Sequence, residues 1–446
     1  MRKITLSFLL TVLTVGIIFA QNVQLSWAKS MGGNGSNIGQ SIAIDVYGNI
    51  YTSGVFVDTI DFDPGNGIYN LVSVGSQDIF IQKLDSAGNF IWAKSMGGSS
   101  SDKGLSITLD ASGNIYTTGY FSNTVDFDPG SGIYNLTSTN SSYNDIFIQK
   151  LDSAGNFIWA KSMGGSNVDR GLSITLDASG NVYTTGYFTD TADFDPGSGT
   201  YNLASAGYSD VFIQKLDSAG NFIWAKSMGG SLGDKGYSLS LDYSGNVYIT
   251  GVFEGTADFD PNSGIYYLTS SGTQDIFIQK LDSAGNFIWA KSMGAGIGDE
   301  GLSISLDASG NIFTTGHFRG PADFDPGSGT YYLSSVGNQG IFIQKLKPTK
   351  PISFTTATKD NSIKVSISPN PNNGSFTLSI NNSNTKTNET YHIEIYDVIG
   401  NLLHREEIRV GSSVTTNMQM ESLSKGLYFL SLKTKENILT TRFVVQ

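Results

Sequence analysis

Pairs of aspartates two residues apart recur through most of the sequence, each followed by a turn-forming Pro-Gly or Pro-Asn step. Carboxylate oxygens gathered at a turn can bind Ca²⁺, but each segment is far shorter than an EF-hand loop and lacks a distal Glu. Aspartates in such segments also accept hydrogen bonds from backbone N–H groups. We therefore favour a structural turn, with Ca²⁺ as the alternative and no other cofactor expected. The pairs are Asp61 and Asp63, Asp126 and Asp128, Asp193 and Asp195, Asp258 and Asp260, and Asp323 and Asp325.

Few other residues offer catalytic chemistry. The chain has no cysteine, which excludes disulfides, thiolate metal sites and a cysteine nucleophile. Its three histidines are His317, His392 and His404. His317 and Arg319 interrupt an otherwise regular pattern, and with a nearby carboxylate they could perform acid–base catalysis. Divergence at the surface explains them better, so we expect the protein not to be an enzyme.

Other recurring residues have the spacing of structural groups. We interpret two sets of aspartates as partners in hydrogen bonds between repeats. They are Asp78, Asp145, Asp210 and Asp275, and Asp102, Asp169, Asp234 and Asp299. The tryptophans and tyrosines could stack on sugar rings, but a Trp at a fixed position in a repeat more often packs between structural units.

The elements that position these residues are repeats of about 65 residues. The tryptophans lie at positions 27, 92, 159, 224 and 289. Within the second unit, residues 105–110, 114–121, 145–151 and 156–162 are predicted strands, because they are rich in β-branched and aromatic residues. The turns DASGN and DSAGN place Gly where a hairpin needs a positive φ. Each unit is thus a hairpin, a long connection that could hold a short excursion of its own, and a second hairpin.

The strand sequence IFI presents apolar side chains on both faces, as expected for a sheet packed between two others. Sheets stacked in this way around an axis form a β-propeller, whereas solenoid repeats are commonly shorter. The array begins with a fourth strand, LSWAKSMGG, and ends with a third strand, IFIQKL. We therefore predict an all-β fold in which five blades form a closed ring, with the N-terminal strand completing the last blade.

The strings GLSITLDASGNIYTTGYF and DIFIQKLDSAGNFIWAKSMGG, repeated in register, resemble the bacterial β-propeller repeat family known as SBBP repeats. The resemblance covers residues 21–346. It implies a fold but no activity, because that family has no common activity.

The N-terminal segment has the pattern of a secretory signal peptide, with Arg2 and Lys3 before an apolar run that ends near Ala20. An uncleaved membrane anchor is the less favoured alternative, and no transmembrane segment is expected in the mature chain. Residues 21–346 carry 31 acidic and 14 basic side chains, a net charge of −17. This charge disfavours binding to nucleic acid or to anionic membrane surfaces.

The last hundred residues have a different pattern. Residues 347–362 contain Pro and Thr and are interpreted as a linker. Six short alternating segments follow within residues 363–446, and they predict a small β-sandwich. They are KVSIS, GSFTLSI, YHIEIYD, LLHREEI, GLYFLSLK and LTTRFVV.

The motifs SISPNPNNGSFTLSI, IEIYDVIGNLL and LSKGLYFLSLKTKENILTTRFVV resemble the C-terminal sorting domain of the type IX (Por) secretion system. The matching positions are Pro369, Asn370, Pro371, Gly374, Tyr396, Asp397, Gly400, Leu423, Gly426 and Tyr428. The resemblance implies a Bacteroidetes-type bacterium, export across the outer membrane, and the secretion machinery as a partner. It implies that the product is released or attached to the surface, often after removal of the domain.

The four Asp-Ser-Ala tripeptides, each in a predicted hairpin turn, resemble an O-glycosylation sequon of such bacteria. An unmodified turn is the favoured interpretation. The candidate acceptors are Ser86, Ser153, Ser218 and Ser283.

Three functional hypotheses follow. The favoured one is a secreted or surface-displayed, non-catalytic propeller that binds an extracellular glycan or protein. A polysaccharide hydrolase or lyase is the second, and it is disfavoured because the repeats are almost interchangeable. A purely structural surface or matrix protein is the third.

Overall fold

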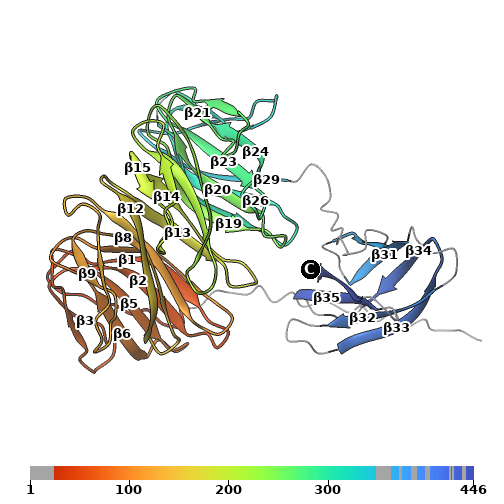
Figure 1. Cartoon of the computed structure of the whole chain (residues 1–446), viewed down its shortest axis with the longest axis horizontal. Coiled ribbons are helices and arrows are strands. Elements are labelled where there is room, and N and C mark those ends of the chain that lie inside the picture. Colours follow the sequence, from red (N-terminus) through yellow and green to blue (C-terminus); the bar gives the residue numbers. More distant parts are fainter. Residues whose placement is uncertain are drawn as a thin grey trace, which may run out of the picture.

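The computed structural model describes residues 25–296, 298–347, 363–370, 374–382, 389–396, 402–420, 423, 426–433 and 438–445, and every regular element in them is a β-strand (Figure 1). The predicted signal peptide, nearly all of the predicted linker, and the sorting-motif positions Pro371, Asp397 and Gly400 lie outside the described residues. No helix in the described part of the chain is long and apolar enough to cross a membrane.

Each of the first four repeats folds into an antiparallel sheet with the predicted pair of hairpins, and the fifth repeat contributes three strands. The first sheet contains β1 (Ile38–Ile44), β2 (Ile50–Phe56), β5 (Asp78–Leu84) and β6 (Phe90–Met96). The second contains β7 (Lys103–Leu109), β8 (Ile115–Phe121), β11 (Asp145–Leu151) and β12 (Phe157–Gly165). The third contains β13 (Arg170–Leu176), β14 (Val182–Phe188), β17 (Asp210–Leu216) and β18 (Phe222–Gly230). The fourth contains β19 (Lys235–Leu241), β20 (Val247–Phe253), β23 (Asp275–Leu281) and β24 (Phe287–Met293). The fifth contains β25 (Glu300–Leu306), β26 (Ile312–Phe318) and β29 (Gly340–Leu346).

The hairpin turns form where the sequence predicts them. In the second repeat, Asp110 Oδ1 accepts hydrogen bonds from the backbone N–H groups of Ser112 and Asn114, each at 2.9 Å. Gly113 has a φ of 80°, a conformation that glycine adopts without steric strain because it has no Cβ. The turn is therefore fixed by its own Asp and Gly.

The long connection in each repeat contains a two-stranded ribbon. The ribbons are β3 (Thr59–Asp61) with β4 (Asn70–Val72), β9 (Thr124–Asp126) with β10 (Asn135–Thr137), β15 (Thr191–Asp193) with β16 (Asn202–Ala204), β21 (Thr256–Asp258) with β22 (Tyr267–Thr269), and β27 (Pro321–Asp323) with β28 (Tyr332–Ser334). Each ribbon also bridges to the chain that leaves the preceding sheet, as Asp126 does to Gly97. The ribbons thus join neighbouring sheets.

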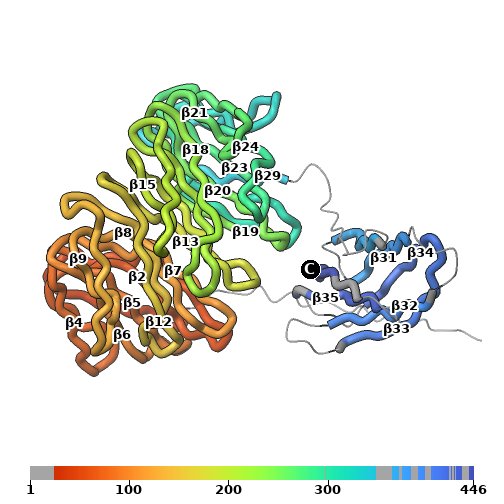
Figure 2. Tube along the Cα trace, in the orientation of Figure 1, coloured from red at the N-terminus to blue at the C-terminus, as the bar shows by residue number. Residues whose placement is uncertain are grey.

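Successive sheets stack on one another through the first strands of neighbouring sheets, and Figure 2 shows the sheets following one another along the chain. Phe80 of β5 packs on Phe62 of its own repeat, with ring centroids 4.9 Å apart. Ile79 and Ile81 on the other face of β5 share a core with Phe121 of the next sheet. The two apolar faces of the IFI strand therefore bind the ribbon on one side and the next sheet on the other.

The predicted closure of the ring is not formed in this structure. In the described residues β29 pairs with β26 alone, and residues 25–31 belong to no strand. Ile341 and Ile343 of β29 are 84% and 79% exposed, whereas Ile79 and Ile81 of β5 are fully buried. The five sheets therefore form an open array in this structure.

The C-terminal residues form two sheets that share one core, as predicted for a sandwich. The first sheet contains β30 (Ile363–Ser368), β31 (Ser375–Asn382) and β34 (Ser413–Gln419). The second contains β32 (Glu389–Tyr396), β33 (Leu402–Val410), β35 (Gly426–Lys433) and β36 (Ile438–Val445). Strand β34 is missing from the sequence prediction, because SVTTNMQ has few apolar residues.

Candidate functional site

The recurring Asp pairs are engaged in their own loops. Asp126 Oδ1 accepts hydrogen bonds from the backbone N–H groups of Asp128 at 3.0 Å and Tyr134 at 2.8 Å. Asp128 Oδ1 accepts one from the N–H of Gly130 at 2.8 Å. The same three bonds recur at Asp61 and Asp63. This geometry is that of a turn built around its carboxylates.

No group of three or more His, Asp or Glu side chains is arranged to hold a metal ion in the part of the chain that the structure describes. The structure does not test Ca²⁺ directly, and calcium binding at these loops stays a prediction. A carboxylate that already accepts two backbone N–H groups has less lone-pair capacity for a cation.

The other two sets of aspartates meet in pairs where one sheet follows another. Asp169 Oδ2 accepts a hydrogen bond from the N–H of Gly165 at 2.7 Å, and Oδ1 accepts one from Thr189 at 3.1 Å. Burial, together with the charge of Asp145, raises the pKa of the Asp169 carboxyl to about 7 against the lowering effect of these bonds. The carboxylates bind the chain that links the sheets, while the backbone N–H of Asp169 donates across the junction to the carbonyl of Asn144 at 2.8 Å.

One oxygen in three of these aspartates has no hydrogen-bond partner among the described residues. The atoms are Oδ1 of Asp145, Asp210 and Asp275. Burial raises the pKa of each of these carboxyls to about 6. Sequence reasoning identified the residues as structural but did not reveal that they are buried and titrate near neutral pH. Aspartates in an exposed loop of a repeat would recur with the same regular spacing. The sequence pattern therefore does not show that these carboxyls are buried.

His317 and Arg319 lie near a carboxylate, as the catalytic alternative requires, since both lower the pKa of Asp299 against the raising effect of its burial. The backbone N–H of Arg319 donates to Asp299 Oδ1 at 2.9 Å. The N–H of Thr189 makes the equivalent bond to Asp169, in a sheet where Tyr187 and Thr189 occupy the positions of His317 and Arg319. The arrangement around Asp299 is therefore the structural one of every repeat.

The Asp-Ser-Ala turns place their serines at the surface. Ser86, Ser153, Ser218 and Ser283 are all exposed. The backbone carbonyl of Ser153 also accepts a hydrogen bond from Lys83 Nζ of the preceding sheet at 3.1 Å. Accessibility is what a modifying enzyme requires, and O-glycosylation itself stays a prediction.

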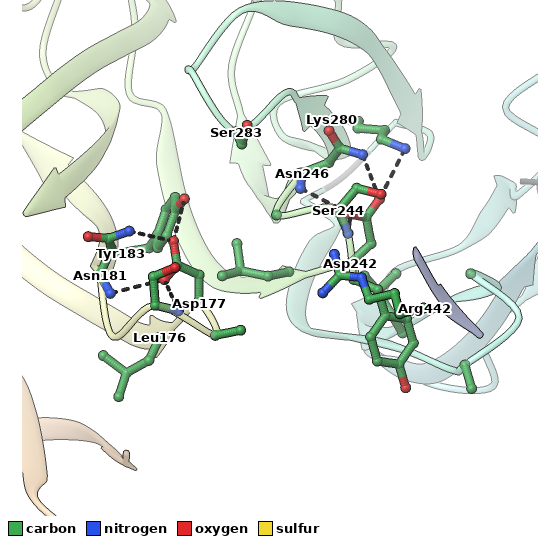
Figure 3. Close-up of a pocket in the computed structure, with 18 of the residues that line it drawn as sticks. Leu176, Asp177, Asn181, Tyr183, Asp242, Ser244, Asn246, Lys280, Ser283 and Arg442 are labelled. Atoms are coloured by element: carbon green, nitrogen blue, oxygen red, sulfur yellow. Dashed lines mark hydrogen bonds and ion pairs between the residues drawn. The ribbon is translucent and has the colours of Figure 1, made fainter. Parts of the chain in front are cut away.

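Hairpin turns of the third, fourth and fifth repeats line a pocket of about 690 Å³ together with Asn370 and Arg442 of the C-terminal domain (Figure 3). Lys280 Nζ lies 3.4 Å from Asp242 Oδ2, and Lys215 Nζ lies 3.5 Å from Asp177 Oδ2. Tyr183 donates a hydrogen bond to Asp177 Oδ2 at 3.3 Å. These two lysines are each paired with an aspartate, so the pocket is a polar recess between hairpin turns.

The Lys-Tyr-Asp groups around this pocket are a feature that sequence reasoning missed. The ammonium of Lys215 lies 4.8 Å from the centre of the Tyr183 ring, and the same contact recurs in other sheets. The signal is present in the sequence as the Lys of IQKL, once per repeat, and the Tyr of NIY or NVY, which Phe313 replaces in the fifth repeat. Only the pairing of β14 with β17, which sets Tyr183 opposite Lys215, shows that they meet.

The described sorting-motif residues hold the C-terminal sandwich together. Asn370 Oδ1 accepts a hydrogen bond from the N–H of Val444 at 2.9 Å, which ties the motif to the last strand. The carbonyl of Gly374 accepts one from Met420 at 2.7 Å. Tyr428 stacks on Phe443 with ring centroids 5.7 Å apart. Gly426 begins β35, and Tyr396 ends β32.

A charged group in the same domain lies outside the predicted motif. Lys433 Nζ lies 2.6 Å from one carboxylate oxygen of Glu394, and Arg405 Nε lies 3.2 Å from the other. The Tyr396 hydroxyl also donates to Glu394. The Glu394 side chain is only 5% exposed, so a buried charge is balanced by two cations.

Comparisons with known proteins match different parts of the chain. Residues 366–446 match the family described as the secretion system C-terminal sorting domain. An uncharacterised WD repeat-containing protein of Acanthamoeba polyphaga mimivirus is 25% identical over 383 residues, which are 70% of this chain and 27% of that protein. The regulatory protein FlaEY of Caulobacter vibrioides is 28% identical over 166 residues, 35% of this chain and 17% of that protein. The chain therefore spans about a quarter or less of the curated relatives it matches.

Similar solved structures add no argument about function. Dimeric latent PorU of Porphyromonas gingivalis matches with a TM-score of 0.20 and 11% identity over 88% of this chain and 34% of that chain. A tetra-tandem repeat from a large adhesion protein matches with a TM-score of 0.16 and 13% identity over 91% and 98%. The sorting-domain match carries the conclusion: it indicates export through the type IX secretion system to the cell surface or the extracellular space.

Proposed function

We propose that this protein is a non-catalytic β-repeat protein, exported through the type IX secretion system, whose repeat array binds an extracellular glycan or protein. The match of residues 366–446 to the sorting domain carries the export half of the proposal. The producing cell is then a Bacteroidetes-type bacterium, and residues 1–20 are the signal peptide that starts the route.

The repeats support a propeller-type architecture. The sheet order β1-β2-β5-β6 is that of a four-stranded propeller blade. The mimivirus relative is a WD repeat-containing protein, and WD repeats form such blades. We propose that the sheets of this chain are five blades of SBBP type, in the open arrangement described above.

One feature favours binding over a purely structural role. The ribbon loop of each repeat has a tyrosine at the same position, and its ring is exposed in every repeat except the fourth, where Tyr266 is partly buried. Tyr69 and Tyr134 are each 38% exposed, Tyr201 is 39% exposed and Tyr331 is 65% exposed. The Tyr134 ring is held against Phe157 at a centroid distance of 4.7 Å. Fixed aromatic faces suit sugar rings, and several weak sites on one rigid body gain by avidity.

A glycan array with purified residues 21–446 tests the binding role. We expect binding by the wild type and at least a tenfold loss in a variant with Tyr69, Tyr134 and Tyr201 replaced by Ser. Retention of binding in that variant would assign the sites elsewhere. Absence of binding to glycans and to extracellular proteins would favour a matrix component. Release of reducing sugars from polysaccharides would instead support the hydrolase or lyase alternative.

Deletion of residues 366–446 tests the route separately. We expect the truncated chain to accumulate in the periplasm while the full chain reaches the surface or the medium. The matched control is the variant Ser379→Ala within the sorting domain, because the Ser379 hydroxyl lies at an exposed site, 3.4 Å from the hydroxyl of Thr415. Equal secretion of the truncated and full chains would overturn the export proposal.

A further inference from the structure

Each end of the repeat array presents one half of a junction that forms four times inside the chain. In the internal junctions the first strand of one sheet packs on the sheet before it, so that β7 contacts β1, β13 contacts β7, β19 contacts β13 and β25 contacts β19. Ile107 and Ile174 in these strands are each 5% exposed. Their equivalent in β1 is Ile42, which is 64% exposed because no sheet precedes it.

The other end exposes the complementary half. Ile146 and Ile148 of β11 are fully buried against the following sheet. Their equivalents in β29, Ile341 and Ile343, are 84% and 79% exposed. β29 is also an edge strand in the described residues, with pairing to β26 only. An exposed apolar edge of this kind is a template for pairing with another strand.

The N-terminal segment already lies where a fourth strand of a preceding sheet would be. Trp27 Nε1 donates to the carbonyl of Ser86 at 3.2 Å, as Trp159 does to that of Ser218 at 3.4 Å. Gly32 bridges to Asp61 of the ribbon, as Gly97 does to Asp126. Residues 25–32 therefore pack on the first sheet as the fourth strand of a preceding sheet would. The other three strands of that preceding sheet are absent from the described residues.

Two hydrogen-bonding groups at the ends are also complementary. In the internal junctions a Ser hydroxyl of one first strand accepts a hydrogen bond from a backbone N–H of the next. Ser41 accepts from Ile107 at 3.2 Å and Ser238 from Ile304 at 3.3 Å. Ser303 of β25 is the equivalent acceptor at the end of the array, and it is exposed. Its matching donor is the N–H of Ile42 at the other end.

We propose that a second copy of this chain occupies these ends, so that β29 of one copy pairs with residues 25–31 of the next. The pairing of β5 with β6 gives the register: Ile341 opposite Met31, Ile343 opposite Lys29, and Lys345 opposite Trp27. The contact continues an interface that the chain forms four times internally, and each half is made of the same repeated residues.

Pairing between copies requires no change in the array, whereas closure within one chain does. All internal junctions have the same Ser-to-backbone bonds, within 0.1 Å of each other. A closed ring within one chain would have to bring β29 onto residues 25–31 of the same chain, and these two segments do not pair with each other in this structure. A head-to-tail contact repeats the existing rotation and generates larger rings or filaments. The proposal does not depend on the proposed ligand-binding role.

Engineered cysteines test the register, because the chain has no native cysteine. Residues 21–446 are prepared as two single variants, Lys29→Cys and Ile343→Cys, and mixed under mild oxidation. We expect a disulfide-linked heterodimer in at least tenfold excess over a mixture of Ser30→Cys with Ile343→Cys. Ser30 is the matched control, because a shift of one residue moves the side chain to the opposite face of a strand.

The same substitutions distinguish the two modes of closure. In a chain that carries both Lys29→Cys and Ile343→Cys, a disulfide within the monomer at high dilution would overturn the proposal in favour of a closed ring. Sedimentation provides an independent measurement. The wild type should form species of at least twice the monomer mass as concentration rises, and Ile341→Glu with Ile343→Glu should remain monomeric. A wild type that is monomeric throughout and gives no cross-link would also overturn the proposal.

Discussion

The indole nitrogen of Trp27 donates a hydrogen bond to the carbonyl oxygen of Ser86 across 3.2 Å, although residue 27 belongs to no strand. The same bond joins Trp159 to Ser218 between two complete sheets. A Cβ on Gly220 would lie 3.3 Å from the Trp159 ring, so this ring packs directly on the hairpin turn of the next sheet. The tryptophan is thus a contact between successive sheets, and it forms even where its own sheet is incomplete.

Trp159→Ala should therefore destabilise the array. The ring shares a core with the third sheet and packs edge-on against Tyr116 at 6.1 Å. Since the side chain is partly exposed, we expect a loss of about 2–4 kcal/mol, at or below the range for fully buried aromatic rings. Urea unfolding measures the loss, and Trp159→Phe should cost less because a ring remains. Unchanged stability with loss of glycan binding would instead identify the ring as part of a ligand site.

Asp210→Asn should stabilise the protein at pH 8 and weaken the dependence of stability on pH. Burial raises the pKa of Asp210 to about 6, only partly opposed by the bond from the N–H of Ala206. A raised folded-state pKa gives stability that is complete below the unfolded value of 3.8 and is lost as pH rises through about 6. An amide has no charge to desolvate, so the gain at pH 8 should be up to about 3 kcal/mol.

The hydrogen bonds of Asp210 make this substitution tolerable. Oδ2 accepts from Ala206 at 3.1 Å, while Oδ1 is the oxygen without a partner, so the amide oxygen and nitrogen can take these two places. Asp234→Asn is the contrasting variant, because both oxygens of Asp234 accept backbone N–H groups and one of these would face an amide N–H. Melting temperatures between pH 4 and pH 8 measure both. A parallel pH profile for wild type and Asp210→Asn would contradict the prediction.

The repeats explain why much of this fold is predictable from the sequence. Gly at position 113 and Asp at position 110 determine a hairpin turn locally, and the same string gives the same turn in every sheet. The alternation in IFI likewise predicts that Ile79 and Phe80 face different neighbours. Such features depend on a few adjacent residues, which the sequence shows directly.

Properties that depend on how distant parts of the chain are arranged were not predictable from the sequence. Ring closure depends on the arrangement of all five sheets together, and in this structure Ile341 at the end of the array is 84% exposed. The burial of Asp210 depends on the approach of Gly229 from the neighbouring strand, where a Cβ would lie 2.4 Å from the carboxyl carbon. Neither ring closure nor the burial of Asp210 can be derived from a local sequence pattern.

Gly119→Ala should disrupt the second sheet. A Cβ at this position would lie 1.8 Å from the carbonyl oxygen of Lys103 on the paired strand and 2.9 Å from the Phe147 ring. Backbone and a packed ring must both move, so we expect a loss of about 3 kcal/mol or more. Gly32→Ala is the control, because no atom lies within 4 Å of its added Cβ. Thermal unfolding measures both variants. If Gly119→Ala melted at the wild-type temperature, as Gly32→Ala should, the predicted steric clash would be wrong.

Removal of Ca²⁺ should leave the stability of the array unchanged, because the DFDPG loops are held by their own hydrogen bonds. Asp126 Oδ1 accepts the N–H groups of both Asp128 and Tyr134. Asp128 Oδ2 lies 2.2 Å from the position of a Cβ on Gly132, so the loop closes tightly around this carboxylate. Asp126→Ala removes two of the bonds and should cost about 1–3 kcal/mol. Melting curves with EGTA and with added CaCl₂ should superimpose for the wild type. A fall in melting temperature on adding EGTA, reversed by CaCl₂ and absent in Asp126→Ala, would show that these loops bind calcium.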